Sequence, residues 1–120
     1  MAVGPDDVRA LALMLPEVEA GAHMGNPDFR VGGRIFATLW VEEERVVVKL
    51  PSDVQAMLVD AEPDIFEPIP GGWGRRGATN LDLGAADEET LRSALLAAWR
   101  NVAPRGLVAR YEPASPPPAA

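Results

Sequence analysis

The residues best suited to chemistry lie in one short segment, GWGRRG at residues 72–77. Glycines let backbone N–H groups approach an anion, and Arg75 and Arg76 supply forked donors for a phosphate. Trp73 offers an aromatic ring on which a base could stack. The competing structural interpretation is that Trp73 packs on a sheet while both arginines are solvated or paired with carboxylates. We therefore take Trp73, Arg75 and Arg76 as candidate anion-binding or nucleic-acid-binding residues.

The same six residues match the dinucleotide-binding pattern G-x-G-x-x-G. In that fold the pattern follows a buried parallel strand and opens a helix that holds the pyrophosphate. Here it follows a proline-broken stretch, residues 65–70, and precedes residues 79–83, which alternate like a half-buried strand. We therefore expect no dinucleotide cofactor at this segment.

Residue types that carry catalysis are scarce. The chain has no cysteine and one histidine, His23, so thiolate chemistry and metal cages built from Cys or His are excluded. The carboxylates fall at predicted helix starts and turns, where solvation and the helix dipole explain them. The sequence thus predicts a non-enzymatic protein without a metal or cofactor, in which His23 is a loop residue. A small-molecule or enzymatic site around His23, Met24 and Trp40 is the remaining alternative.

Charge is distributed unevenly along the 120 residues. The chain carries 18 acidic and 11 basic residues, a formal net charge of −7, with a sequence pI near 4.6. Residues 1–70 hold 5 basic and 13 acidic residues, whereas residues 71–120 hold 6 and 5. The overall acidity disfavours nucleic acid as a partner, but the nearly neutral second segment leaves local contact with phosphates feasible.

Length and composition predict one domain over residues 1–112. Residues 113–120 are rich in proline, and we expect them to be disordered or polyproline-like. No membrane span is expected, and residues 1–15 lack the pattern of an export signal. The lack of cysteine is compatible with a reducing compartment, so we expect a cytoplasmic protein.

The periodicity of apolar residues places the elements that must position these side chains. It predicts a helix over residues 5–15, an irregular connection to about residue 28, and a hairpin over 29–40 that turns at Gly32-Gly33. An acidic turn at 42–44 leads into a strand over 45–50.

Further along, Ser52 and Gln55 fit a capping box that opens a helix ending before Pro63. Residues 65–70 then form an edge strand or an extended loop, and residues 79–83 complete a second hairpin across the glycine-rich turn. The longest helix follows over residues 87–102. The resulting order, α-β-β-β-α-β-β-α, is typical of an α+β domain with helices packed on a mostly antiparallel sheet.

Four stretches in series resemble the MmcQ/YjbR family. They are residues 8–18 (VRALALMLPEV), 29–39 (FRVGGRIFATL), 47–50 (VVKL) and 73–77 (WGRRG). The resemblance covers residues from about 5 to 110 and implies a secretion-chaperone-like α+β fold with a double-wing motif, in which two β-wings are flanked by helices.

The resemblance also implies DNA as the partner and carries no catalytic residues. Position by position, it points to Lys49 on the third predicted strand together with Trp73, Arg75 and Arg76. Ala78 stands where many relatives have an aromatic residue, which removes one possible stacking group.

Two hypotheses from different classes result. In the first, the protein contacts nucleic-acid phosphates weakly through Arg75 and Arg76, with charge added by Lys49, Arg30 and Arg34, while Trp73 stacks or positions the wing. In the second, it is an acidic protein-interaction or chaperone-like module, dimeric and without affinity for nucleic acid, whose open sheet face or edge recruits a protein partner.

Overall fold

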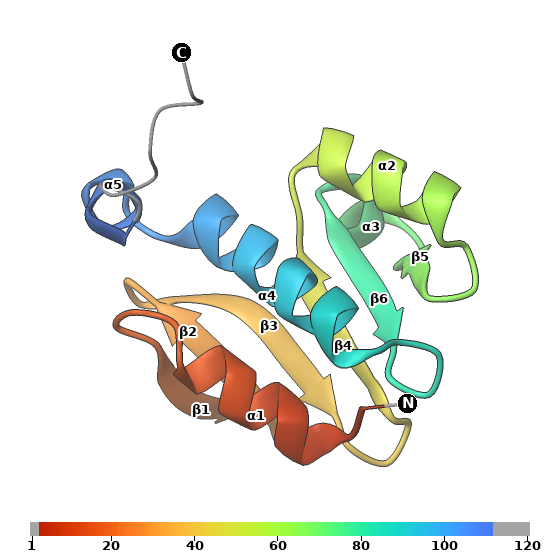
Figure 1. Ribbon diagram of the computed structural model, residues 1–120, viewed down its shortest axis with the longest axis horizontal. Helices are drawn as coiled ribbons and strands as arrows, with labels where there is room; N and C mark the ends of the chain where they lie inside the picture. The colour runs from red at the N-terminus through yellow and green to blue at the C-terminus, as the bar shows by residue number, and fades with distance from the viewer. Residues whose placement is uncertain (1–2, 112–120) are drawn as a thin grey trace.

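The computed structural model describes residues 3–111, which form an α+β fold with helices packed on a six-stranded antiparallel sheet (Figure 1). Within this range the strands are β1 (Glu19–His23), β2 (Asn26–Val31), β3 (Arg34–Trp40), β4 (Arg45–Lys49), β5 (Phe66–Pro68) and β6 (Ala78–Asp82). The helices are α1 (Pro5–Leu13), α2 (Ser52–Ala61), α3 (Gly72–Arg75), α4 (Glu88–Val102) and α5 (Arg105–Tyr111). The predicted α+β class is confirmed. The predicted tail, residues 113–120, lies outside the described residues.

The strands are arranged in the order β1-β2-β3-β4-β6-β5, and each neighbouring pair is antiparallel. Gly32 and Gly33 turn β2 into β3, and the acidic turn joins β3 to β4, as predicted. β5 is the outermost strand beside β6, so the stretch broken by prolines does include an edge strand. Both predicted hairpins therefore belong to one continuous sheet.

The core lies between the sheet and the helices α1 and α4, which cover the same face (Figure 1). Val46 and Val48 on β4 are fully buried on this side, and the residues between them point to the other face. From α4, the buried Trp99 donates a hydrogen bond from its indole N–H to the Pro16 carbonyl oxygen at 3.1 Å. Each fully buried Val, Leu or Phe contributes roughly 1.5–3 kcal/mol, and this burial holds sheet and helices together.

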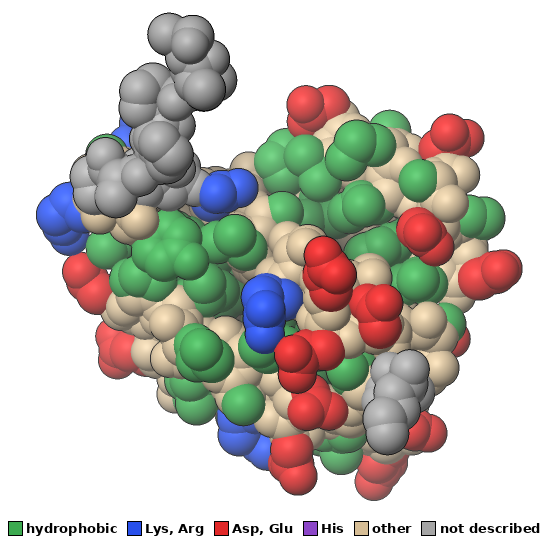
Figure 2. All heavy atoms as spheres, viewed as in Figure 1, with side chains coloured by type: hydrophobic (Ala, Val, Ile, Leu, Met, Phe, Trp, Pro, Cys, Tyr) green, Lys and Arg blue, Asp and Glu red, His purple; other side chains and the backbone are tan. Residues whose placement is uncertain are grey.

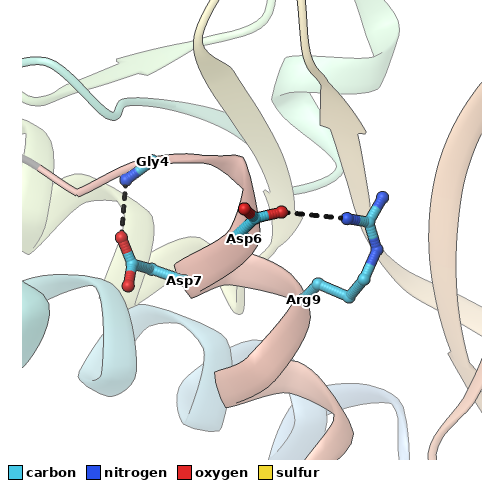
Figure 3. A network of polar contacts seen from close by, with 4 residues as sticks. All are labelled: Gly4, Asp6, Asp7 and Arg9. Carbon is cyan, nitrogen blue, oxygen red and sulfur yellow. Dashed lines mark hydrogen bonds and ion pairs between the residues drawn. The ribbon is translucent and has the colours of Figure 1, made fainter.

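The helix ends follow helix-dipole and capping chemistry. At the start of α1, the Asp7 carboxylate accepts a hydrogen bond from the Gly4 N–H at 2.8 Å, and Asp6 pairs with Arg9 at 3.4 Å (Figure 3). At the start of α4, the Asp87 carboxylate accepts from the Thr90 N–H at 2.8 Å. This backbone hydrogen bond holds the pKa of Asp87 below its ordinary value. The predicted helix over residues 87–102 is confirmed.

Three elements were not predicted, so the expected order α-β-β-β-α-β-β-α is incomplete. β1 lies within the stretch expected to be irregular, where pairing with β2 overrides a composition poor in β-branched residues. α3 replaces the expected flexible turn between β5 and β6. α5 follows directly after Pro104. This proline cannot continue α4, and its carbonyl oxygen accepts the first hydrogen bonds of α5, from the N–H groups of Leu107 and Val108. Within the described range, no helix is long and apolar enough to cross a membrane.

Candidate binding surface on the open sheet face

Trp73 lies on α3, a helix of one turn that packs against β6. Its side chain is 65% exposed. The glycines around it have a structural cause: a Cβ on Gly74 would overlap the Ile69 carbonyl oxygen, and one on Gly77 would overlap that of Leu50. The backbone approach, rather than a nucleotide, thus accounts for these two glycines.

Gln55 on α2 fixes the position of α3. Its amide Nε2 donates to the Gly74 carbonyl oxygen at 2.9 Å and to the Thr79 hydroxyl at 3.0 Å. The Thr79 hydroxyl in turn donates to the Gly77 carbonyl oxygen at 2.9 Å. The predicted capping box is therefore wrong: Ser52 is the first helical residue and makes no capping bond, because the tertiary contacts of Gln55 outcompete the local motif.

The sheet face turned away from α1 and α4, called here the open face, carries a hollow of about 350 Å³. Because side chains alternate along a strand, Arg45, Val47 and Lys49 of β4, which alternate with the buried valines, reach this face. The apolar lining consists of Ile35, Trp40, Val47, Ile69, Trp73 and Ala78. Thr38, Arg45 and Lys49 complete the lining. The hollow is thus an apolar surface with two indole rings and two cations.

Trp40 and Arg45 contact each other in the lining of this hollow. They are paired across β3 and β4, and the Arg45 guanidinium lies 4.7 Å from the centroid of the indole ring. Arg45 also donates to the Glu43 carboxylate at 2.9 Å and to Asn80 Oδ1 at 3.0 Å. Within the described residues, the buried Nε1 of Trp40 has no hydrogen-bond partner. A buried donor without a partner is rare in folded proteins.

The structure places two of the six predicted site residues in this hollow, and two more follow Trp73 in the chain. Lys49 and Trp73 line the same hollow, and Arg75 and Arg76 lie on α3 and at its end. Both arginines are exposed, and neither makes an ion pair or side-chain hydrogen bond within residues 3–111. Both guanidinium groups are therefore accessible to solvent near Trp73.

The other two predicted residues are placed differently. Arg30 is opposite Ile35 in the sheet and forms an ion pair at 3.0 Å with the fully buried carboxylate of Asp28. The hydrogen bond to Asp28 raises the pKa of Arg30 above its ordinary value. Arg34 lies away from the open face, in a cleft shared with Arg100 and Arg105.

Sequence reasoning missed Trp40 and Arg45 as members of this surface, and Gln55 as its support. The alternation of residues 45–49 was the available signal, because it places Arg45 on the same side of the strand as Lys49. Nothing in the sequence indicated that Gln55 would reach the glycine-rich segment 19 residues away.

The alternative site around His23 gains little from the structure. His23 ends β1, and its side chain lies outside the described part of the chain. The neighbouring Met24 is 87% exposed and encloses no space. Within the described residues, no group of three or more His, Cys, Asp or Glu residues is arranged to hold a metal ion.

Comparisons with known proteins place the chain by family and by fold. The model of the YjbR family matches residues 13–101. A crystal structure of the Deinococcus radiodurans protein DR2400, described by the domain DUF419, is similar with a TM-score of 0.74 and 19% sequence identity. The likeness covers 98% of this chain and 91% of that protein, which shows a shared fold. No curated protein matches the chain.

Proposed function

This chain belongs to the YjbR family, and we propose that it is a non-enzymatic protein that binds single-stranded nucleic acid weakly on its open face. The observation that carries this proposal is that Lys49 and the exposed Trp73 line one apolar hollow, while Arg75 and Arg76, which follow Trp73 in the chain, make no ion pair within the described residues. Stacking groups and phosphate-binding groups are thus side by side, as a single strand requires.

The bases are recognised by stacking. Trp73 exposes 65% of its surface, and Trp40 lies in the same hollow with Ile35 and Val47. Stacking of a base on an aromatic side chain contributes about 1–3 kcal/mol and does not depend strongly on the base.

The phosphates are recognised by charge. Lys49, Arg75 and Arg76 offer donors that no carboxylate in the described residues occupies. A duplex keeps its bases stacked on one another, so only a single strand can place a base in the hollow. The net charge of −7 repels a polyanion, so we expect low affinity. The contacts of these cations with phosphates make binding weaken as salt rises.

Fluorescence anisotropy of labelled oligonucleotides tests the proposal. We expect single strands to bind at about 50 mM salt and to bind much more weakly at about 200 mM, with matched duplexes weaker at both. The double variant Arg75→Ala/Arg76→Ala weakens binding and flattens the salt dependence. Arg92→Ala is the control, because this arginine pairs with Glu88 on α4 and lies on the helix side. Unchanged affinity in the double variant contradicts the proposal.

A second function is favoured by the largely apolar lining of the same hollow. Exposed apolar patches often mark protein interfaces, and two copies of this chain could cover Ile69 and Trp73 by pairing their open faces. Sedimentation velocity separates the two functions. A dimer that Trp73→Ala dissociates, in protein without affinity for single strands, supports self-association, whereas a monomer at high concentration rejects it.

A further inference from the structure

A second group of cations lies away from the open face, at the corner between α4 and α5. Arg34 at the start of β3, Arg100 on α4 and Arg105 at the start of α5 line one open cleft of about 620 Å³. None of the described residues that line it is acidic. On the face shown in Figure 2, basic side chains lie beside the α5 end, in the middle and at the lower edge, and most acidic side chains lie away from the α5 end. The cleft is therefore a local positive region on an acidic molecule.

Two of the arginines in this cleft make no ion pair with a described carboxylate, as is also true of Arg75 and Arg76 at the open face. Elsewhere in the described range, five arginines hold a carboxylate: Arg9, Arg30, Arg45, Arg92 and Arg110. Arg34 and Arg105 have no such partner in that range, although acidic residues outnumber basic ones in the chain. Two guanidiniums left without carboxylates in one cleft keep a positive potential that attracts an anion.

Packing holds the walls of the cleft in place. The turn between β2 and β3 lies directly against Pro104, since a Cβ built on Gly32 would be 3.1 Å from the proline ring. Asn101 at the end of α4 donates from Nδ2 to the Lys49 carbonyl oxygen at 3.1 Å, and Leu107 buries α5 in the core. The segments that carry the arginines are thus fixed relative to one another, which lowers the cost of ordering them around a ligand.

We propose that this cleft binds a phosphate group, either as inorganic phosphate or as the phosphate of a small metabolite. Arg34 and Arg105 approach from separate elements, so that two planar guanidinium forks can each donate two hydrogen bonds to a tetrahedral anion. Arg100 lines the same cleft. The volume lies in the range of about 300–1,000 Å³ typical of small-molecule sites, so an organic group can accompany the phosphate. This site is independent of the open face and stands whether or not nucleic acid binds there.

The test is an NMR titration of the full chain, observing the arginine Nε–H signals, with inorganic phosphate, ribose 5-phosphate and acetate as separate probes. We expect saturable shifts of the Arg34 and Arg105 signals with both phosphates and no saturable shift with acetate. Tighter binding of the sugar phosphate identifies a metabolite as the ligand, and equal affinities identify the inorganic ion. Saturation by acetate at similar concentration, or shifts confined to Arg75 and Arg76, overturns the proposal.

Variants sharpen the same experiment. Arg34→Ala/Arg105→Ala removes two exposed side chains, so the fold is retained and phosphate affinity falls by about tenfold or more, as expected for losing hydrogen bonds to a charged group. Arg34→Lys keeps the charge but loses the fork, and we expect intermediate affinity. Arg9→Ala is the matched control and leaves the affinity unchanged. Full affinity for phosphate in the double variant overturns the site. Failure of the open face is measured separately, by the affinity of Trp73→Ala for a single strand.

Discussion

The side-chain amide of Gln55 donates a hydrogen bond to the Gly74 carbonyl oxygen at 2.9 Å, which ties α2 to the one-turn helix that carries Trp73. The two residues are 19 positions apart, and the bond joins two separate helices, α2 and α3. The open face thus owes the placement of its exposed tryptophan to a residue that lies outside the hollow.

Gln55→Ala should destabilise the fold. It leaves the Gly74 carbonyl and the Thr79 hydroxyl without this donor, and the loss of a partly buried hydrogen-bond partner costs about 1–3 kcal/mol. Urea unfolding measures the change. Ser52→Ala is the control, and because Ser52 makes no capping bond we expect a change within about 0.5 kcal/mol. Equal losses of stability in the two variants would support a capping box formed by Ser52 and Gln55, and would contradict the tertiary role given to Gln55.

Gly74→Ala should be much more damaging than Gly72→Ala. The new Cβ at Gly74 would overlap the Ile69 carbonyl oxygen, and forcing atoms into a packed site costs roughly 1–3 kcal/mol or more. At Gly72 the nearest atom is the tip of Arg75 at 3.9 Å, so alanine fits there. Thermal unfolding compares the two variants, and similar melting temperatures would show that the approach to Ile69 is not a constraint.

Arg30→Ala should destabilise the sheet more than Arg9→Ala. The Asp28 carboxylate is fully buried and pairs with Arg30 at 3.0 Å, so removing the guanidinium leaves a buried acceptor unsatisfied at a cost of about 1–3 kcal/mol. Arg9 pairs with the fully exposed Asp6, and such surface pairs contribute about 0–1 kcal/mol. Chemical denaturation measures the free energy of unfolding of both variants. A larger loss of stability in Arg9→Ala than in Arg30→Ala would contradict this prediction.

The cap at Asp87 should make stability depend on pH. Its backbone hydrogen bond to Thr90 lowers the pKa in the folded state, so its contribution is present above the ordinary carboxyl pKa of 3.8 and is lost as the pH falls through the folded value. The difference in stability between wild type and Asp87→Ala should therefore shrink between neutral and strongly acidic pH. Asp87→Asn retains a capping oxygen without the charge, and its difference from Asp87→Ala should vary little with pH. If the difference in stability between wild type and Asp87→Ala did not change with pH, the charge of the Asp87 carboxylate would not be the source of the stabilisation.

Much of this fold follows from local patterns, and the exceptions share one physical reason. The valine-rich strand β4 and the apolar stripe of α4 were predictable because their side chains themselves supply the burial. β1 was not, since a stretch of Glu, Ala, Gly and His becomes a strand only by pairing with β2. α3 likewise depends on the backbone contact of Gly74 with Ile69, which no local propensity reports.

The candidate site was predictable to a similar extent. Trp73, Arg75 and Arg76 are adjacent in sequence, and Lys49 could be added from the family resemblance. Arg34 is separated from them because the turn between β2 and β3 packs against Pro104, a contact between residues more than 70 positions apart. Its grouping with Arg100 and Arg105 depends on the path of α5, an element that the sequence did not predict.

The open face is tested most directly by the affinity of Trp73 variants for a labelled single strand at low salt, measured by fluorescence anisotropy. Trp73→Phe should retain most of the affinity because a ring remains for stacking, whereas Trp73→Ala should lose about 1–3 kcal/mol, a weakening of roughly 5-fold to 150-fold. Both variants change a side chain that is largely exposed, so neither should unfold the protein. Equal affinity of wild type and Trp73→Ala, or no affinity in any of the three proteins, would contradict nucleic-acid binding on this face.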